Sequence, residues 1–179
     1  MESQVVENRI NIDKITQVTK KVNVTALLMA LLLLALGIAA MSVGFFREEI
    51  NSWTNNILIF AGIILILWAF ILIFLKHKKY VYTATGSTVK SCDYYMQREQ
   101  METLKMLLSH AGFSLAKPIH FLENGNVCVK VLKSDDAHFA AVQVFEYASF
   151  SFLAATQLYC YTEVQASDFI TFLERCKVT

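Results

Sequence analysis

Two uncharged apolar runs, 24–46 and 57–75, constrain this chain of 179 residues more than any other feature. As helices rising 1.5 Å per residue, they would be about 34 and 28 Å long, close to the roughly 30 Å hydrocarbon core of a bilayer. Ten residues separate them, which leaves room only for a tight antiparallel turn. The sequence therefore predicts a membrane α-helical hairpin over 24–75, with transmembrane helices at 24–46 and 57–75, between an N-terminal tail (1–23) and a small C-terminal domain (76–179).

The basic residues around the apolar runs predict the orientation of the hairpin. Seven lie outside it and one, Arg47, lies in its connecting loop; the seven are Arg9, Lys14, Lys20, Lys21, Lys76, Lys78 and Lys79. Because positive charge accumulates on the cytosolic side, we expect an integral protein of an inner or plasma membrane with both termini and the C-terminal domain in the cytosol. Its four cysteines should then be reduced thiols.

The lysines that follow the second run form a basic collar. Lys76, Lys78 and Lys79 are predicted to contact anionic lipid headgroups; the simpler alternative is that they only set the topology, a role that they serve in either case. The tail 1–23 carries charges of both signs and only a partial apolar stripe. It reads as a flexible tail or, alternatively, as a short amphipathic helix on the membrane surface, with the tail slightly favoured.

Small residues repeat at spacings of three and four along one face of the first apolar run. They are Ala26, Ala30, Gly37, Ala40 and Gly44. Such residues let helix backbones approach closely, so this face should pack either against the second helix of the same chain, which we favour, or against another subunit. The two apolar runs of the hairpin contain no acidic, basic or histidine side chain, which argues against an ion or proton path and favours an anchor or an oligomerising element.

The C-terminal residues alternate between strand and helix patterns. A helical stripe over 96–111 and a second helix beginning near Ser167 interrupt segments rich in Val, Phe and Tyr, and Asn124-Gly125 is a strong hairpin sequence. Predicted strands lie at 80–84, 88–95, 119–122, 127–132, 139–147 and 156–164. The order β-β-α-β-β-β-β-α predicts a two-layer α+β domain, with an antiparallel sheet and two helices on one face.

No catalytic motif emerges from the sequence. Gly86 lies in a turn sequence and belongs to neither a P-loop nor a dinucleotide fingerprint, and no cysteine or serine has the spacing of a nucleophilic site. Asp135-Asp136-x-His138 reads as a solvated turn rather than a metal site. We therefore predict no catalytic residue, no metal and no cofactor, and the net charge of +1 gives no argument for nucleic-acid binding.

Aromatic residues are the remaining candidates for a binding surface. The aromatic residues in this part of the chain are Phe145, Tyr147, Phe150, Phe152, Tyr159 and Tyr161. They would form an exposed patch if they lined an open sheet face, with Phe145, Tyr147, Tyr159 and Tyr161 as the candidate partner contacts, or, as we favour, they would fill the core. The sequence suggests a non-enzymatic, membrane-anchored interaction or assembly protein, either a homo-oligomer or a subunit of a membrane complex. The alternative is a ligand-sensing module for a lipid or small metabolite, which would need convergent polar groups; candidates are Arg98, Lys117, Lys130 and Glu146.

Overall fold

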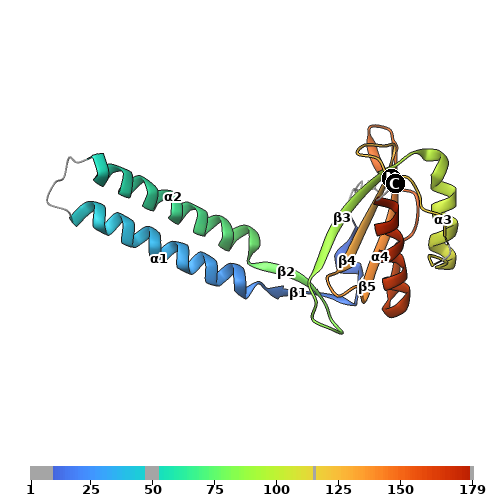
Figure 1. Ribbon diagram of the computed structural model, residues 1–179, viewed down its shortest axis with the longest axis horizontal. Coiled ribbons are helices and arrows are strands. Elements are labelled where there is room, and N and C mark those ends of the chain that lie inside the picture. Colours follow the sequence, from blue (N-terminus) through green and yellow to red (C-terminus); the bar gives the residue numbers. More distant parts are fainter. Residues whose placement is uncertain (1–9, 47–52, 115, 178–179) are drawn as a thin grey trace, which may run out of the picture. The chain divides into compact units, whose positions relative to one another are not determined.

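The computed structural model describes residues 10–46, 53–114 and 116–177, apart from the side chains of Asp13 and Lys177. The chain divides into two compact units. One comprises Lys20–Lys79 and holds two long helices; the other combines Met1–Thr19 with Tyr80–Thr179 and holds an antiparallel sheet with helices (Figure 1). Residues from both sides of the helical hairpin therefore contribute to the second unit.

The first unit is a pair of apolar helices, α1 (Val24–Phe46) and α2 (Trp53–Lys76). The first coincides with its predicted range, whereas the second begins four residues before the predicted Ile57. Asn23 caps α1, because its Oδ1 accepts a hydrogen bond from the backbone N–H of Ala26 at 3.3 Å. Both helices are long and apolar enough to cross a membrane, judged by length and composition.

The residues buried between the two helices recur every seven positions in each helix. The residues buried between them are Ala30, Gly37 and Gly44 from α1, and Asn55, Gly62 and Ala69 from α2. A seven-residue period is typical of left-handed helix pairs, in which the same face stays in contact over successive turns. The predicted small-residue face thus packs within the chain, with Ala26 and Ala40 half-buried beside it.

The sheet of the second unit is antiparallel throughout. Neighbouring strands follow the order β3 (Val89–Met96), β4 (Val127–Ser134), β5 (Phe139–Ala148) and β6 (Ser151–Ala154). A fifth strand, β7 (Tyr159–Thr162), also pairs with β5. The long strand β5 pairs with β7 along its first half and with β6 along its second half. Separately, β1 (Val18–Val22) and β2 (Lys78–Tyr82) form a two-stranded ribbon.

One face of this sheet is covered by α3 (Met101–His110) and α4 (Glu163–Lys177), as predicted; the short 3-10 turn η2 (Arg98–Gln100) precedes α3. Phe113 lies at the centre of this core, with ring centroids 5.0 Å from Phe169 and 5.2 Å from Tyr161. The hydroxyl of Tyr161 donates a hydrogen bond to the carbonyl of Leu108. The sheet contributes alternate residues to the core: Val127, Val129, Val131, Ala140, Val142 and Val144.

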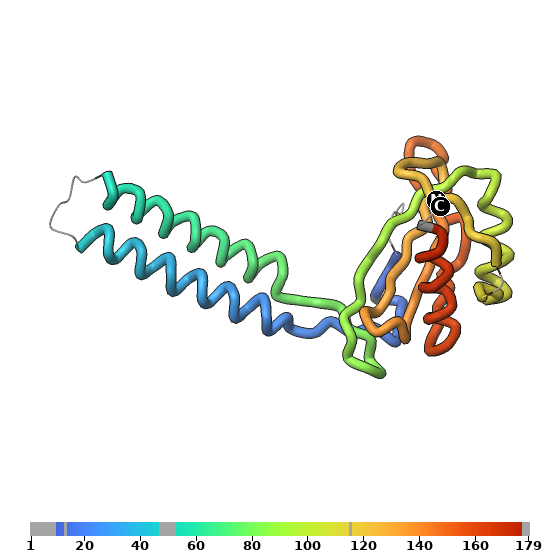
Figure 2. The backbone as a smooth tube through the Cα atoms, in the orientation of Figure 1, coloured from blue at the N-terminus to red at the C-terminus, as the bar shows by residue number. Residues whose placement is uncertain are grey.

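The opposite face of the sheet is covered by an N-terminal arm, which we define as residues 10–18 and which includes the 3-10 turn η1 (Ile12–Lys14). Ile10, Ile15 and Val18 are buried in a second core that the sheet completes with Cys128, Leu132, Phe139, Ala141 and Phe145. The blue arm lies on the side of the sheet away from α3 and α4 (Figure 2). This corrects the expectation of a separate tail or surface helix for residues 10–18; residues 1–9 lie outside the described part.

Three local predictions were wrong. Residues 119–122 form no strand; only an isolated bridge joins Leu122 to Tyr95, and the Asn-Gly turn leads into β4 from a loop. The last helix begins at Glu163 and not near Ser167, which shortens the preceding strand. The strand β6 was missed. The predicted order of elements nevertheless agrees, because β6 takes the place of the absent strand.

Candidate interaction surface

The structure separates the four aromatic residues predicted as a patch. Phe145 is buried under the arm, Tyr161 is buried under the helices, and Tyr159 is partly buried beside that same helical core. Only Tyr147, near the end of β5, is exposed, at 48%. Phe145 and Tyr161 therefore belong to the interior, on opposite faces of the sheet, and Tyr147 is the one residue of the four that belongs to the surface.

Among the described residues of the unit that holds the sheet, the exposed aromatic side chains, Tyr147 and Phe150, lie in the β5–β6 hairpin. Tyr147 and Phe152 are cross-strand partners, and their rings meet edge to face with centroids 5.3 Å apart. Phe152 also contacts Tyr95 of β3, at 6.3 Å between centroids. Edge-to-face pairs of this kind add about 0.5–1.5 kcal/mol beyond burial, so the hairpin holds its rings in a fixed arrangement. We call Tyr147, Phe150 and Phe152 the aromatic tip.

The turn of this hairpin has an unusual backbone. Ala148 and Ser151 pair, so Ser149 and Phe150 form a two-residue turn, with φ of 51° and 65°. Positive φ at both central residues is the pattern of a type I′ turn, for which Asn and Gly are preferred. A bulky residue at positive φ is costly, by roughly 1–2 kcal/mol. Phe150 recovers little of that cost by burial, because its side chain is 95% exposed.

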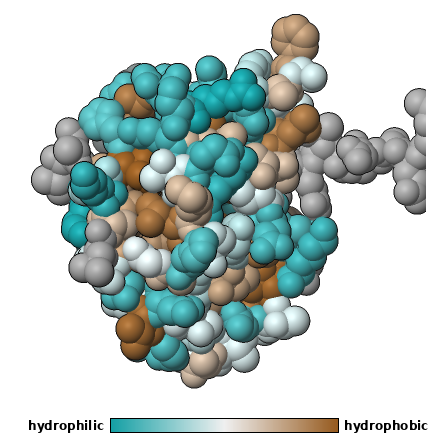
Figure 3. Space-filling view, turned by 90° about the vertical axis from the view of Figure 1, so that its right-hand side faces the viewer, coloured by the Kyte–Doolittle hydropathy of each residue, from teal (hydrophilic) through white to brown (hydrophobic). Residues whose placement is uncertain are grey.

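The aromatic tip carries no charge. The segment 147–154 contains no acidic or basic residue. The neighbouring Glu146 is engaged by Arg98 at 2.7 Å. An apolar protrusion stands at the top of the space-filling view (Figure 3), where the orange turn between β5 and β6 lies in Figure 1. An uncharged, projecting aromatic group is suited to entering an apolar pocket of another protein.

The polar residues considered for a ligand pocket do not converge. Arg98 pairs with Glu146, whereas Lys130 lies 3.8 Å from Asp93 and beneath the ring of Phe145, on the arm side of the sheet. Lys117 is exposed on a loop. The four candidates are thus divided between the two sides of the domain, and their arrangement does not favour the ligand-sensing alternative.

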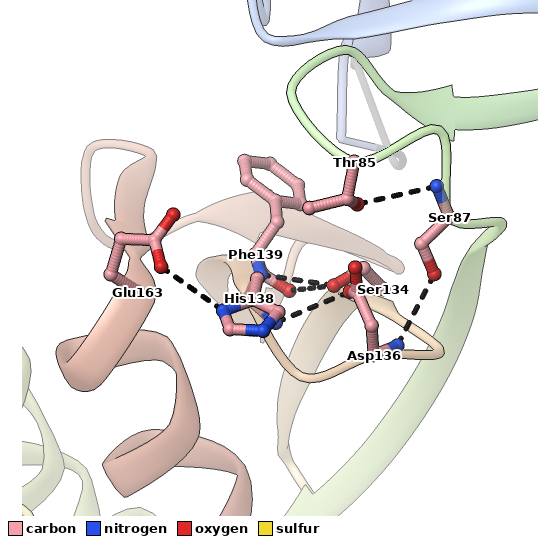
Figure 4. Close-up of polar contacts among 7 residues, drawn as sticks. All are labelled: Thr85, Ser87, Ser134, Asp136, His138, Phe139 and Glu163. Carbon is pink, nitrogen blue, oxygen red and sulfur yellow. Dashed lines mark hydrogen bonds and ion pairs between the residues drawn. The ribbon is translucent and has the colours of Figure 1, made fainter.

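The Asp135-Asp136-x-His138 sequence forms an ordered turn between β4 and β5 (Figure 4). The buried hydroxyl of Ser134 accepts a hydrogen bond from the N–H of Phe139 at 2.9 Å. His138 contacts Glu163 through Nδ1 at 3.1 Å, and its carbonyl accepts the N–H of Glu163 at 2.9 Å. These bonds attach the turn to the start of α4. Among the described residues, no group of three or more His, Cys, Asp or Glu side chains is placed to hold a metal ion.

The predicted collar is joined by a second pair of lysines. Lys20 and Lys21 lie on β1, and Lys78 and Lys79 lie on the paired strand β2. The sequence assigned only the lysines after the second helix to the collar, because the pairing of the tail with residues 78–82 could not be foreseen. The β1–β2 ribbon brings both groups to the same ends of the two helices.

Comparison with protein-family models, with curated proteins and with solved structures finds no match. The evidence that the aromatic tip is an interaction surface therefore comes from its geometry alone. Sequence reasoning named Phe150 and Phe152 among the aromatic residues of an open sheet face, but it did not place them at a hairpin turn, because Ser149-Phe150 is not a recognised turn sequence. Its position between two apolar alternating segments was the one available indication that a hairpin turns there.

Proposed function

We propose that this chain is a non-enzymatic, membrane-anchored protein whose α+β domain binds a protein partner through the aromatic tip. The observation that carries the proposal is Phe150, an aromatic side chain that is 95% exposed on a turn whose backbone disfavours it. Strained positions of this kind concentrate at functional sites, where the strain is offset elsewhere in the fold. The stability of the turn does not explain why position 150 is Phe, whereas a role in binding a partner does.

The helical hairpin supports the anchoring part of the proposal. Only one residue in seven of each helix is buried between α1 and α2, so apolar side chains cover their outer surfaces. A bilayer would remove that surface from water. Because both ends of the hairpin lead into one folded unit, both ends belong on the same side of the membrane, and the seven basic residues favour the cytosolic side.

The chemistry of the tip supports a protein partner. Tyr147 and Phe152 give a rigid, partly exposed aromatic base, and Phe150 projects beyond it. Binding energy at protein interfaces is concentrated in a few such aromatic anchors, which fill pockets in the partner. The partner is a second copy of this chain or another subunit of a membrane complex.

Affinity purification of the full-length protein in a mild detergent, followed by native mass spectrometry, tests this function. We expect a defined multiple of the 20.3 kDa subunit or a stoichiometric second protein. Phe150→Ala should lose that assembly, whereas Met106→Ala, a matched truncation of an exposed apolar residue on α3, should keep it. A parent protein that is monomeric and retains no partner, or equal assembly of both variants, would contradict the proposal.

A further inference from the structure

Five lysines lie close in sequence to the start of α1 and the end of α2. The backbone N–H of Asn23 donates to the carbonyl of His77 at 2.7 Å, which holds the start of α1 beside the end of α2. Within three residues of that bond lie Lys20, Lys21, Lys76, Lys78 and Lys79, all of them exposed or half-buried. We call these five residues the lysine ribbon. Every member belongs to the compact unit Lys20–Lys79.

A polar atom at the centre of the lysine ribbon has no partner. Within the described residues, Nδ1 of His77 is buried and makes no hydrogen bond. Leaving a buried donor or acceptor unpaired is costly, and most such groups in folded proteins are satisfied. His77 is flanked in sequence by Lys76 and Lys78, so an anionic ligand bound beside it would meet positive charge. Such a ligand would hydrogen-bond to the buried ring nitrogen only after the atoms that cover this nitrogen move aside.

We infer that the lysine ribbon and His77 form a binding site for the phosphate group of an anionic phospholipid. Phosphate oxygens accept hydrogen bonds from ammonium groups and from an imidazole N–H. A lipid is the source that the structure favours, because the lysines directly adjoin helices long and apolar enough to cross a membrane. The site shares no residue with the aromatic tip, so this inference goes beyond the proposed function.

A phosphate-binding site and a set of lysines that only orients the protein in the membrane make different demands on the individual residues. Orientation in the membrane depends on the number of basic residues near the helix ends. Binding of a phosphate depends instead on the positions of the lysines and on a ring N–H of His77 as a hydrogen-bond donor. Replacing His77 should therefore weaken phosphate recognition although it leaves the count of lysines unchanged.

Native mass spectrometry of the full-length protein in mild detergent, titrated with phosphatidic acid or with zwitterionic phosphatidylcholine, tests the site. We expect clear preference for phosphatidic acid. Lys78→Gln with Lys79→Gln should weaken its binding about 25-fold, at roughly fivefold for each lysine. The matched control, Lys117→Gln with Lys133→Gln, removes the same charge from the other unit and should stay within about twofold of the parent.

His77→Leu should reduce the preference for phosphatidic acid several-fold. Inorganic phosphate at millimolar concentration should not displace the lipid; displacement would assign the site to a soluble phosphate compound and overturn the lipid assignment. Equal losses in the two lysine pairs, or an unchanged preference in His77→Leu, would overturn the site itself. Phe150→Ala should bind phosphatidic acid like the parent, so a failure of this inference is distinguishable from a failure of the proposed function.

Discussion

Gly37 of α1 and Gly62 of α2 lie opposite each other at a close contact between the two helix backbones. A Cβ atom placed on Gly37 would lie 2.9 Å from the carbonyl oxygen of Gly62, and one placed on Gly62 would lie 2.7 Å from that of Gly37. Both distances are shorter than an ordinary van der Waals contact. The backbone of each helix therefore occupies the space that a side chain on the other would need.

Enlarging either glycine should force the helices apart. We expect Gly62→Leu to destabilise the hairpin by about 1–3 kcal/mol, the usual cost of overpacking a tight interface. Unfolding of the purified protein by SDS in mild detergent, followed by circular dichroism, measures the effect. Ala39→Leu adds a comparable volume at an exposed position of α1 and serves as the control. Equal unfolding midpoints for the two variants would contradict the close approach.

The N-terminal arm should contribute to the stability of the domain. Ile15 is 4% exposed and packs in the core that the arm closes over the sheet. Ile15→Ala should lower the free energy of unfolding by about 2–5 kcal/mol, as expected for truncating a buried aliphatic side chain. Thr16→Ala, at the neighbouring exposed position, is the control and should lie within about 0.5 kcal/mol of the parent. Thermal unfolding in detergent compares them; similar losses would show that the arm is not an integral part of the core.

The sequence predicted the helical hairpin better than the arm, for a physical reason. The run 24–46 has a length and an uncharged composition that only a long apolar helix satisfies, so local information suffices. The arm has a weak periodicity, and Ile10, Ile15 and Val18 are buried only because a sheet formed more than 70 residues later supplies the opposing surface. Contacts of such long range leave little trace in the local pattern.

Glycine at position 150 should stabilise the domain. Phe150→Gly relieves the cost of a bulky residue at φ 65°, and we expect a net gain of about 0.5–1 kcal/mol after the entropy that glycine loses on folding. Ser149→Gly, at φ 51°, should give a similar gain and keep the aromatic side chain. Thermal unfolding measures both. Partner binding should be lost only in Phe150→Gly, and a destabilised Phe150→Gly would contradict the account of the turn.

The sequence contained the aromatic residues of the tip but did not reveal which of them are exposed. The alternation of β5 places Phe145 and Tyr147 on the same face, and the sequence could not say that the arm covers one and leaves the other exposed. Phe150 was among the aromatic residues considered, but a turn without Gly or Asn gave no indication that this residue projects from the end of a hairpin. A turn that breaks the local preference is itself informative, because such conflicts are expected at functional positions.

The turn between β4 and β5 predicts a dependence of stability on pH. Desolvation alone would raise the pKa of Asp136, but hydrogen bonds involving Ser134, Thr85 and the N–H of His138 outweigh it and lower the pKa to about 2. An unfolded chain has an Asp pKa of about 3.9. Because the folded value is lower, the carboxylate stabilises the fold above about pH 4, and this contribution is lost as the pH falls from about 4 to about 2.

Asp136→Asn should remove this part of the pH dependence while retaining an oxygen that can accept the N–H of His138. Melting temperatures recorded between pH 2 and pH 7 compare the variant with the parent. We expect the two curves to converge at the acid end and the parent to be more stable above about pH 4. Parallel curves over the whole range would show that Asp136 does not titrate as described.

Site-specific photocrosslinking in intact cells tests the central claim most directly. A benzophenone amino acid replaces Phe150 in the full-length chain, and in a parallel strain it replaces Met106, which is 62% exposed on α3. If the aromatic tip is the anchor of an interface, illumination should give one discrete protein adduct from position 150 and none of the same mass from position 106. No protein adduct from position 150, or identical adducts from both positions, would contradict the claim that this domain binds its partner through the tip.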